Sequence, residues 1–314
     1  MVKHFICEAF DVQGVLAPVF TPFLESGSID FSIIPSYMAY LNENHINGIL
    51  VGGTTGEGMS LSVHERKSLF EAWIAAARPF GTKVIAQVGG APLPDVLELA
   101  THAENLKADG LMTLPELYYK PRTVDQLVCY LQQVSGAAST LPIVYYHFPM
   151  MTGVDVSMPK LFQEASKLKL KLKLPNFKGV KADLGVAMEV AHLLREDQKI
   201  FIANHHIAPS VLMGHDTSIA TVTNLFPVLV HNIVSAVKDS DVVNARVLQK
   251  RLNEIVTALA VEGDFVPAMK TAMELVTGIR MGQTRPPLVS FNYEQRSRLK
   301  DTLIRLDVKL QDTA

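Results

Sequence analysis

The chain has 314 residues, of which 48% are hydrophobic and 19% charged, an ordinary composition for one large globular domain or two smaller ones. A formal net charge of -2 gives no overall field that would attract nucleic acid or an anionic membrane. Two cysteines, Cys7 and Cys129, predict neither a disulfide framework nor a zinc site, and they favour a reducing compartment. Because we find no signal-peptide core and no run of roughly 20 apolar residues, we expect a cytoplasmic protein without a membrane span.

Short apolar runs alternate with longer amphipathic segments along most of the chain. Eight runs are predicted as strands, at residues 15–20, 48–51, 83–88, 110–114, 142–147, 177–181, 199–203 and 217–222. Patterns of helical period lie between most of them, for example at residues 62–77, 95–106, 123–138 and 186–194. The α/β alternation favours a closed (β/α)8 TIM barrel, although an open doubly wound sheet remains possible.

The chain becomes helical after the eighth predicted strand. Helices are expected at residues 228–237, 245–261, 267–276 and 293–306, and Pro286 and Pro287 separate the last two. We therefore predict a barrel over residues 1–225 and a C-terminal helical extension over residues 226–314 that packs on it. The alternating lysines and leucines at 167–174 predict a strand with one basic face, either a surface connection or an anion or membrane patch.

Several common motifs are missing. The chain has no G-x-x-x-x-G-K-[ST] phosphate loop, no G-x-G-x-x-G dinucleotide fingerprint and no G-x-S-x-G nucleophile elbow. His64-Glu65 is not followed by the second histidine of a zinc-protease helix. His205 and His206 are adjacent and would point to opposite sides of an extended segment, so they make a poor metal pair.

One lysine stands at the end of a short apolar run. Only a neutral amine attacks a ketone, and desolvation inside a pocket favours that form. Barrel enzymes carry their chemistry at the C-terminal ends of their strands, where Lys181 is expected, whereas Lys178 lies near the start of the same run. Lys181 is therefore the candidate nucleophile, with an ordinary solvated lysine as the alternative.

Two further strand ends carry groups that suit a keto acid. Thr54 and Thr55 lie in the glycine-rich turn 52–58, where hydroxyls and backbone N–H groups can hold a carboxylate; the alternative is an ordinary turn with a threonine helix cap. Tyr146 ends the fifth strand and can pass a proton to or from a substrate hydroxyl, unless it is a packed aromatic of the barrel rim. Tyr145 should face the other way.

Together these segments resemble the dihydrodipicolinate synthase / N-acetylneuraminate lyase family. The family pattern is a G-[ST]-T-G-E turn, a Y-x-x-P segment and a G-x-K lysine, and this chain has GTTGE at 53–57, YHFP at 146–149 and GVK at 179–181. The resemblance spans roughly residues 14–288. Outside the site, the segments 56–63, 151–154 and 275–282 resemble those of the animal sialate lyases.

The resemblance implies a Schiff-base aldolase on a (β/α)8 barrel, usually a homotetramer. Lys181 would form an imine with C2 of a 2-keto acid, and Tyr146 would relay the proton of the C4 hydroxyl as the C3–C4 bond breaks. Thr54 and Thr55 would hold the substrate carboxylate. Hydrolysis would then release pyruvate, and neither a metal nor an organic cofactor would be required.

The chain departs from the family at the residues that would bind the part of the substrate remote from the keto acid. Sialate lyases carry two acids after the seventh strand, and this chain has Asn204 and His205 there. Thr221 stands for a serine near the end of the eighth strand, and the Ser/Thr that follows the lysine is either replaced by Asp183 or deleted. All four are candidate substrate-binding residues.

Three functions follow from the resemblance. The first is cleavage of N-acetylneuraminate to N-acetylmannosamine and pyruvate. The second is an aldolase or dehydratase of the same mechanism that acts on another 2-keto-3-deoxy acid. The third is a barrel that binds keto acids without turnover, since family membership does not fix function.

Overall fold

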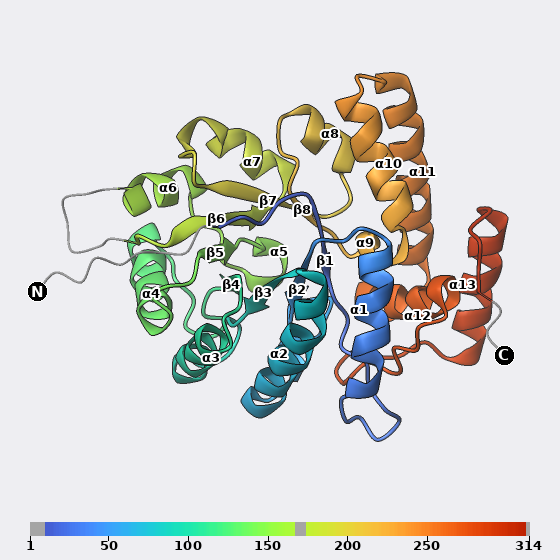
Figure 1. Ribbon diagram of the computed structural model, residues 1–314, viewed down its shortest axis with the longest axis horizontal. Coiled ribbons are helices and arrows are strands. Elements are labelled where there is room, and N and C mark those ends of the chain that lie inside the picture. The colour runs from blue at the N-terminus through green and yellow to red at the C-terminus, as the bar shows by residue number, and fades with distance from the viewer. Residues whose placement is uncertain (1–9, 167–173, 312–314) are drawn as a thin grey trace, which may run out of the picture.

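A computed structural model describes residues 10–166 and 174–311, and its centre is a closed barrel of parallel strands (Figure 1). Each strand pairs with the next, and the last pairs with the first, so the predicted barrel is confirmed and the open sheet is wrong. The strands are β1 Val15–Pro18, β2 Gly48–Val51, β3 Lys83–Gln87, β4 Gly110–Thr113, β5 Ile143–Tyr146, β6 Phe177–Ala182, β7 Lys199–Ala203 and β8 Ser218–Ile219.

The barrel interior is packed with side chains and closed at its N-terminal end. Alternate residues of the strands point inward and form an apolar cluster that includes Leu16, Leu50, Ile85, Met112, Val144, Phe201 and Ile219. The Phe10 ring lies 5.7 Å from the Phe201 ring and covers that end. Tyr146 belongs to the same cluster and ends β5. The end of the barrel that carries Tyr146 is therefore its C-terminal mouth.

Helices surround the barrel and pack their apolar faces on the outer side of the strands (Figure 1). The longer ones are α1 Ile34–Glu43, α2 Val63–Ala77, α3 Leu93–Asn105, α4 Val124–Ala137, α6 Met158–Ser166 and α7 Leu184–Val190. Three short helices, α5 Pro149–Thr152, α8 Ile207–Leu212 and α9 Val222–Leu225, begin just after strands β5, β7 and β8. Side-chain caps from Ser62, Thr123 and Asp183 start α2, α4 and α7.

The last part of the chain forms the predicted helical extension on one side of the barrel (Figure 1). Its helices are α10 Pro227–Lys238, α11 Val242–Val261, α12 Phe265–Thr277 and α13 Tyr293–Arg305. α10 and α11 pack against α8, and α12 packs against α9. The boundary between residues 225 and 226 stays a prediction. Within the two described ranges no helix combines the length and the apolar character needed to cross a membrane.

The structure differs from the sequence prediction at the eighth strand. The eighth strand was expected over residues 217–222, but β8 has only Ser218 and Ile219, because the chain turns at Thr221 and Val222 begins α9. The alternating run at 167–174 lies outside the described residues except for Leu174, which is buried and is not in a strand.

A buried ion pair ties the extension to the turn that follows β2. Lys270 of α12 donates to Glu57 at 2.8 Å, and their side chains are 2% and 0% exposed. Glu57 also accepts from the backbone N–H of Arg285 at 2.9 Å, and Lys270 donates to the Gln283 carbonyl at 2.9 Å. Burial lowers the pKa of Lys270, and Glu57 opposes that shift. The turn and the C-terminal part of the chain are thus held by one charged contact.

Arg285 extends this contact to the surface. Its guanidinium donates to both oxygens of Glu65 and to the carbonyls of Gly27 and Ser60. The hydrogen bonds that Glu65 accepts from Arg285, together with those from Ser62, lower its pKa to about 2. The guanidinium also lies 4.7 Å from the centroid of the Phe23 ring.

Removing one partner of the buried pair should be costly, because the other charge is left without compensation. We expect Glu57→Gln or Lys270→Met to lower the free energy of unfolding by about 3–5 kcal/mol. The control is Lys250→Met, which removes an exposed pair with Glu254 at 3.8 Å and should change it by less than about 0.5 kcal/mol. Urea unfolding measures all three, and wild-type stability in both single variants would contradict the role given to the pair.

Candidate active site

Strand β6 begins with a β-bulge. Ile143 and Val144 are adjacent in β5, but their partners in β6 are Phe177 and Gly179, which leaves Lys178 as an extra residue. An extra residue reverses the alternation, so the side chains after the bulge are out of phase with those before it.

The bulge decides where Lys181 points. Phe177 packs in the layer between barrel and helices, and strict alternation from Phe177 would turn Lys181 into that layer as well. The extra residue shifts the phase, and Lys181 becomes the register partner of Tyr146, which faces the barrel interior. The candidate lysine and the candidate tyrosine therefore lie side by side on the inner face.

Lys178 is engaged elsewhere. Its Nζ lies 2.7 Å from an oxygen of Asp197, which just precedes β7, and Arg195 also donates to Asp197 at 3.0 Å. This ion pair lies toward the N-terminal end of the barrel, away from the mouth. Of the two lysines in the strand, only Lys181 reaches the candidate site.

Lys181 and Tyr146 form a compact buried unit. The Lys181 Nζ lies 3.8 Å from the centroid of the Tyr146 ring, and the two residues are only 6% and 4% exposed. Phe148 stacks parallel to Tyr146 with the ring centroids 5.6 Å apart, which fixes the plane of the phenol. The Tyr146 hydroxyl lies 3.3 Å from the Thr54 hydroxyl. Across the described ranges no carboxylate forms an ion pair with Lys181.

The turn after β2 brings two threonines to the mouth. Its backbone is closed by hydrogen bonds from Glu57 N to Thr54 O and from Gly58 N to Gly53 O, both 3.1 Å long. The Thr55 hydroxyl lies 2.7 Å from the Thr221 hydroxyl, which joins the turn to the segment after β8. The turn thus contacts Tyr146 through Thr54 and the segment after β8 through Thr55.

Asn224 holds Thr221 in place. This fully buried amide donates to the Thr221 carbonyl at 3.0 Å and to the Pro18 carbonyl at 2.9 Å, and it accepts from the Tyr37 hydroxyl at 2.6 Å. Sequence reasoning assigned it no role, because an asparagine in an apolar stretch has no motif of its own.

Asn204 and His205 lie in the segment that joins β7 to α8. Asn204 is exposed with φ +67°, and its side-chain oxygen accepts from His206 N at 3.0 Å. The His205 ring lies 4.9 Å from the His206 ring, and burial together with His206 lowers the pKa of His205, so the imidazole is neutral near pH 7. In the part of the chain that the structure describes, no three His, Cys, Asp or Glu side chains gather as metal ligands.

The Asp183 and Tyr145 side chains both have structural roles. The Asp183 carboxylate is exposed and accepts from Val186 N at 3.0 Å, so at least one of its oxygens caps α7. Tyr145 packs in the outer layer, as strand alternation predicts, and burial raises its pKa well above the usual value.

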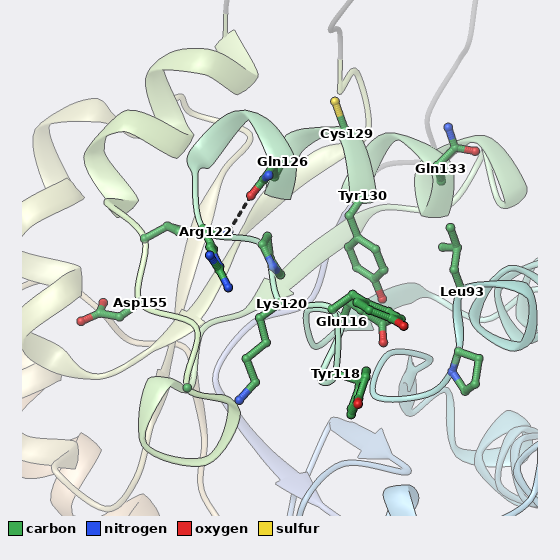
Figure 2. A pocket seen from close by; sticks show the side chains of 15 residues that line it. Leu93, Glu116, Tyr118, Lys120, Arg122, Gln126, Cys129, Tyr130, Gln133 and Asp155 are labelled. Atoms are coloured by element: carbon green, nitrogen blue, oxygen red, sulfur yellow. Dashed lines mark hydrogen bonds between the residues drawn. The ribbon is translucent and has the colours of Figure 1, made fainter.

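Figure 2 shows a cavity of about 1440 Å³ that does not include this constellation. None of the site residues above lines it. Its wall comes from the start of α3, the segment before α4, α4 itself and the segment around Asp155. It includes Tyr118, Tyr119, Lys120 and Arg122.

The fold and the sequence of the whole chain are similar to those of known proteins. The Dihydrodipicolinate synthetase family matches residues 11–306. The chain belongs to this family. It is 32% identical to N-acetylneuraminate lyase A of Xenopus laevis over 302 residues, 95% of this chain and 97% of that protein. The solved structure of Proteus mirabilis N-acetylneuraminate lyase is 27% identical, with a TM-score of 0.87 over 95% of this chain and 99% of that one. The structure of KD(P)GA from T. tenax is 25% identical, with a TM-score of 0.83 over 94% of this chain and 99% of that one.

Gly179 is the residue that lets β6 pass close to β7 beside the site. Its φ is +146°, and a Cβ there would lie 1.8 Å from the Lys199 carbonyl oxygen, so Gly179→Ala must push the two strands apart. We expect a loss of about 1–3 kcal/mol or more in the free energy of unfolding. Gly136→Ala in α4 meets open space and should gain about 0.5–1 kcal/mol. Urea unfolding of both variants is the measurement, and a Gly179→Ala protein as stable as the wild type would show that the close approach is not limiting.

Proposed function

We propose that this protein is a class I aldolase that cleaves N-acetylneuraminate to N-acetylmannosamine and pyruvate. The observation that carries the proposal is the buried amine of Lys181 against Tyr146, whose hydroxyl reaches Thr54. The similarity to N-acetylneuraminate lyase A of Xenopus laevis covers 95% of this chain and supports the same activity.

The first half of the reaction forms the imine. The neutral Lys181 amine attacks the C2 ketone of the open-chain substrate, and the carbinolamine loses its oxygen as water. Thr54, Thr55 and the N–H groups of their turn hold the neighbouring carboxylate, which orients C2 toward the amine. The protonated imine then withdraws electrons from C3.

The second half breaks the carbon–carbon bond. Tyr146, with Thr54 as its hydrogen-bond neighbour, relays the proton of the C4 hydroxyl: its oxygen accepts that proton while its own phenolic proton passes to the bound substrate carboxylate, from which it later returns to C3. The C3–C4 electron pair moves into the enamine as the aldehyde leaves. Protonation at C3 restores the imine. Water then adds to C2, pyruvate departs and the free lysine returns, so the cycle needs no redox step.

Asn204 and His205 bear on which substrate tail the site binds. Asn204 and His205 offer fewer acceptor sites for sugar hydroxyls than two carboxylates, and they lack charge assistance. This favours a second candidate, the same chemistry on a 2-keto-3-deoxy acid with a shorter or different tail, and the similarity to KD(P)GA from T. tenax is consistent with it. Pyruvate release from a panel of such acids separates the two candidates, and no release from any of them would favour a barrel that only binds keto acids.

We also propose self-association to a homotetramer. Tyr118 and Tyr119 line the cavity of Figure 2 and are each 83% exposed, and exposed tyrosines of this kind are suited to contact with another copy of the chain.

Incubation with pyruvate and borohydride should reduce the imine to a stable adduct on Lys181. We expect mass spectrometry of the digest to place the whole label there, because Lys178 is held by Asp197. Lys181→Met should abolish labelling, while Lys178→Met, the matched control, should retain it. A label on Lys178, or none on the wild type, is incompatible with the proposed nucleophile.

Replacing Tyr146 by Phe removes the proton relay and keeps the ring that packs against Phe148 and Lys181. We expect kcat for cleavage to fall by about 10²–10⁴-fold, the usual scale for a positioned acid–base group. Pyruvate should still trap on Lys181, because imine formation precedes bond cleavage. Near-normal turnover in this variant would mean that another group carries the proton.

A further inference from the structure

Gln249 of helix α11 hydrogen-bonds to the segment between β7 and α8 and to the first turn of α8. This residue is nearly buried. Its Nε2 donates to the His205 carbonyl at 2.8 Å and to Asn253 Oδ1 at 2.8 Å, and its Oε1 accepts from Ala208 N at 2.8 Å. Both ends of the amide are therefore committed to defined partners.

The two backbone partners are the groups that set the shape of this segment. Ala208 N lies in the first turn of α8, where a helix has no internal acceptor for it. The His205 carbonyl comes directly after Asn204, whose left-handed φ of +67° turns the chain out of β7. Gln249 thus holds one backbone group on each side of His206 and constrains the backbone that carries Asn204 and His205.

We infer that Gln249 is a positioning residue that sets how the site reads the substrate tail. It acts through Asn204 and His205 and does not touch the substrate itself. The inference rests on the proposed function, because it assigns to these two residues the end of the substrate remote from the imine.

The half of the site that binds pyruvate is built independently. Lys181, Tyr146 and Thr54 come from β6, β5 and the turn after β2, and no hydrogen bond among the described residues joins them to Gln249. A change at Gln249 should therefore separate tail recognition from imine chemistry, which a general loss of stability would not do.

The test is Gln249→Met, which keeps the length of the side chain and removes both backbone contacts. Two substrates are compared, N-acetylneuraminate and a short-tailed 2-keto-3-deoxy acid that the wild type cleaves. We expect KM for the long-tailed acid to rise about tenfold, the size of one or two neutral hydrogen bonds, with kcat within about twofold. KM for the short-tailed acid and the rate of borohydride trapping with pyruvate alone should not change.

Two further variants keep the test decisive. Thr101→Val removes a hydrogen bond of 3.1 Å between α3 and α4, away from the mouth, and should leave the ratio of the two KM values unchanged. Gln249→Glu keeps the acceptor for Ala208 N, loses the donor to the His205 carbonyl, and should shift the ratio in the same direction as Gln249→Met.

The outcomes separate this inference from the proposed function. If the wild type releases pyruvate but both Gln249 variants keep the wild-type ratio, the positioning role is wrong. An equal loss with both substrates and in pyruvate trapping would likewise overturn it and assign Gln249 to stability. If the wild type cleaves no 2-keto acid and traps no pyruvate, the proposed function itself fails.

Discussion

The turn that carries Thr54 and Thr55 at the mouth of this barrel depends on one buried interaction, the ion pair of Glu57 and Lys270. Two charges taken out of water are tolerable only because each finds further hydrogen bonds, Glu57 from Arg285 N and Lys270 to the Gln283 carbonyl. A well-packed apolar pair of similar volume could be as stable. We infer that what the charges add is one defined alignment between the turn after β2 and the C-terminal part of the chain.

The extension is therefore part of the site and more than a cover for the barrel. One of its helices fixes the turn that carries Thr54 through Lys270, and another reaches the segment after β7 through Gln249. The strands provide the chemical groups Lys181 and Tyr146, which hardly depend on the extension for their position. The strand residues thus form a rigid centre, and the loop residues around it lie outside that centre. A barrel of this kind can therefore change which substrates it binds by substitution of a few loop residues, while its strands stay the same.

The fold was largely predictable because a parallel strand buried on both faces reads as a continuous apolar run, and such runs stand out between amphipathic helices. The end of the barrel was less predictable. The eighth strand was expected to continue through Thr221, but the buried Asn224 amide binds the Thr221 and Pro18 carbonyls and bends the chain into α9. No local sequence pattern predicts the contact between Asn224 and Pro18, which are more than 200 positions apart.

The sequence by itself determined the kind of fold and the kind of chemistry, because a lysine and a tyrosine at strand ends, together with a threonine turn, are local features. The tertiary structure decided which face those side chains use. Counted from Phe177 by strict alternation, Lys181 belongs to the outer layer; only pairing with β5, where Lys178 is left over as a bulge, turns it toward Tyr146. Register is a property of two strands together, so one strand's residues cannot specify it alone.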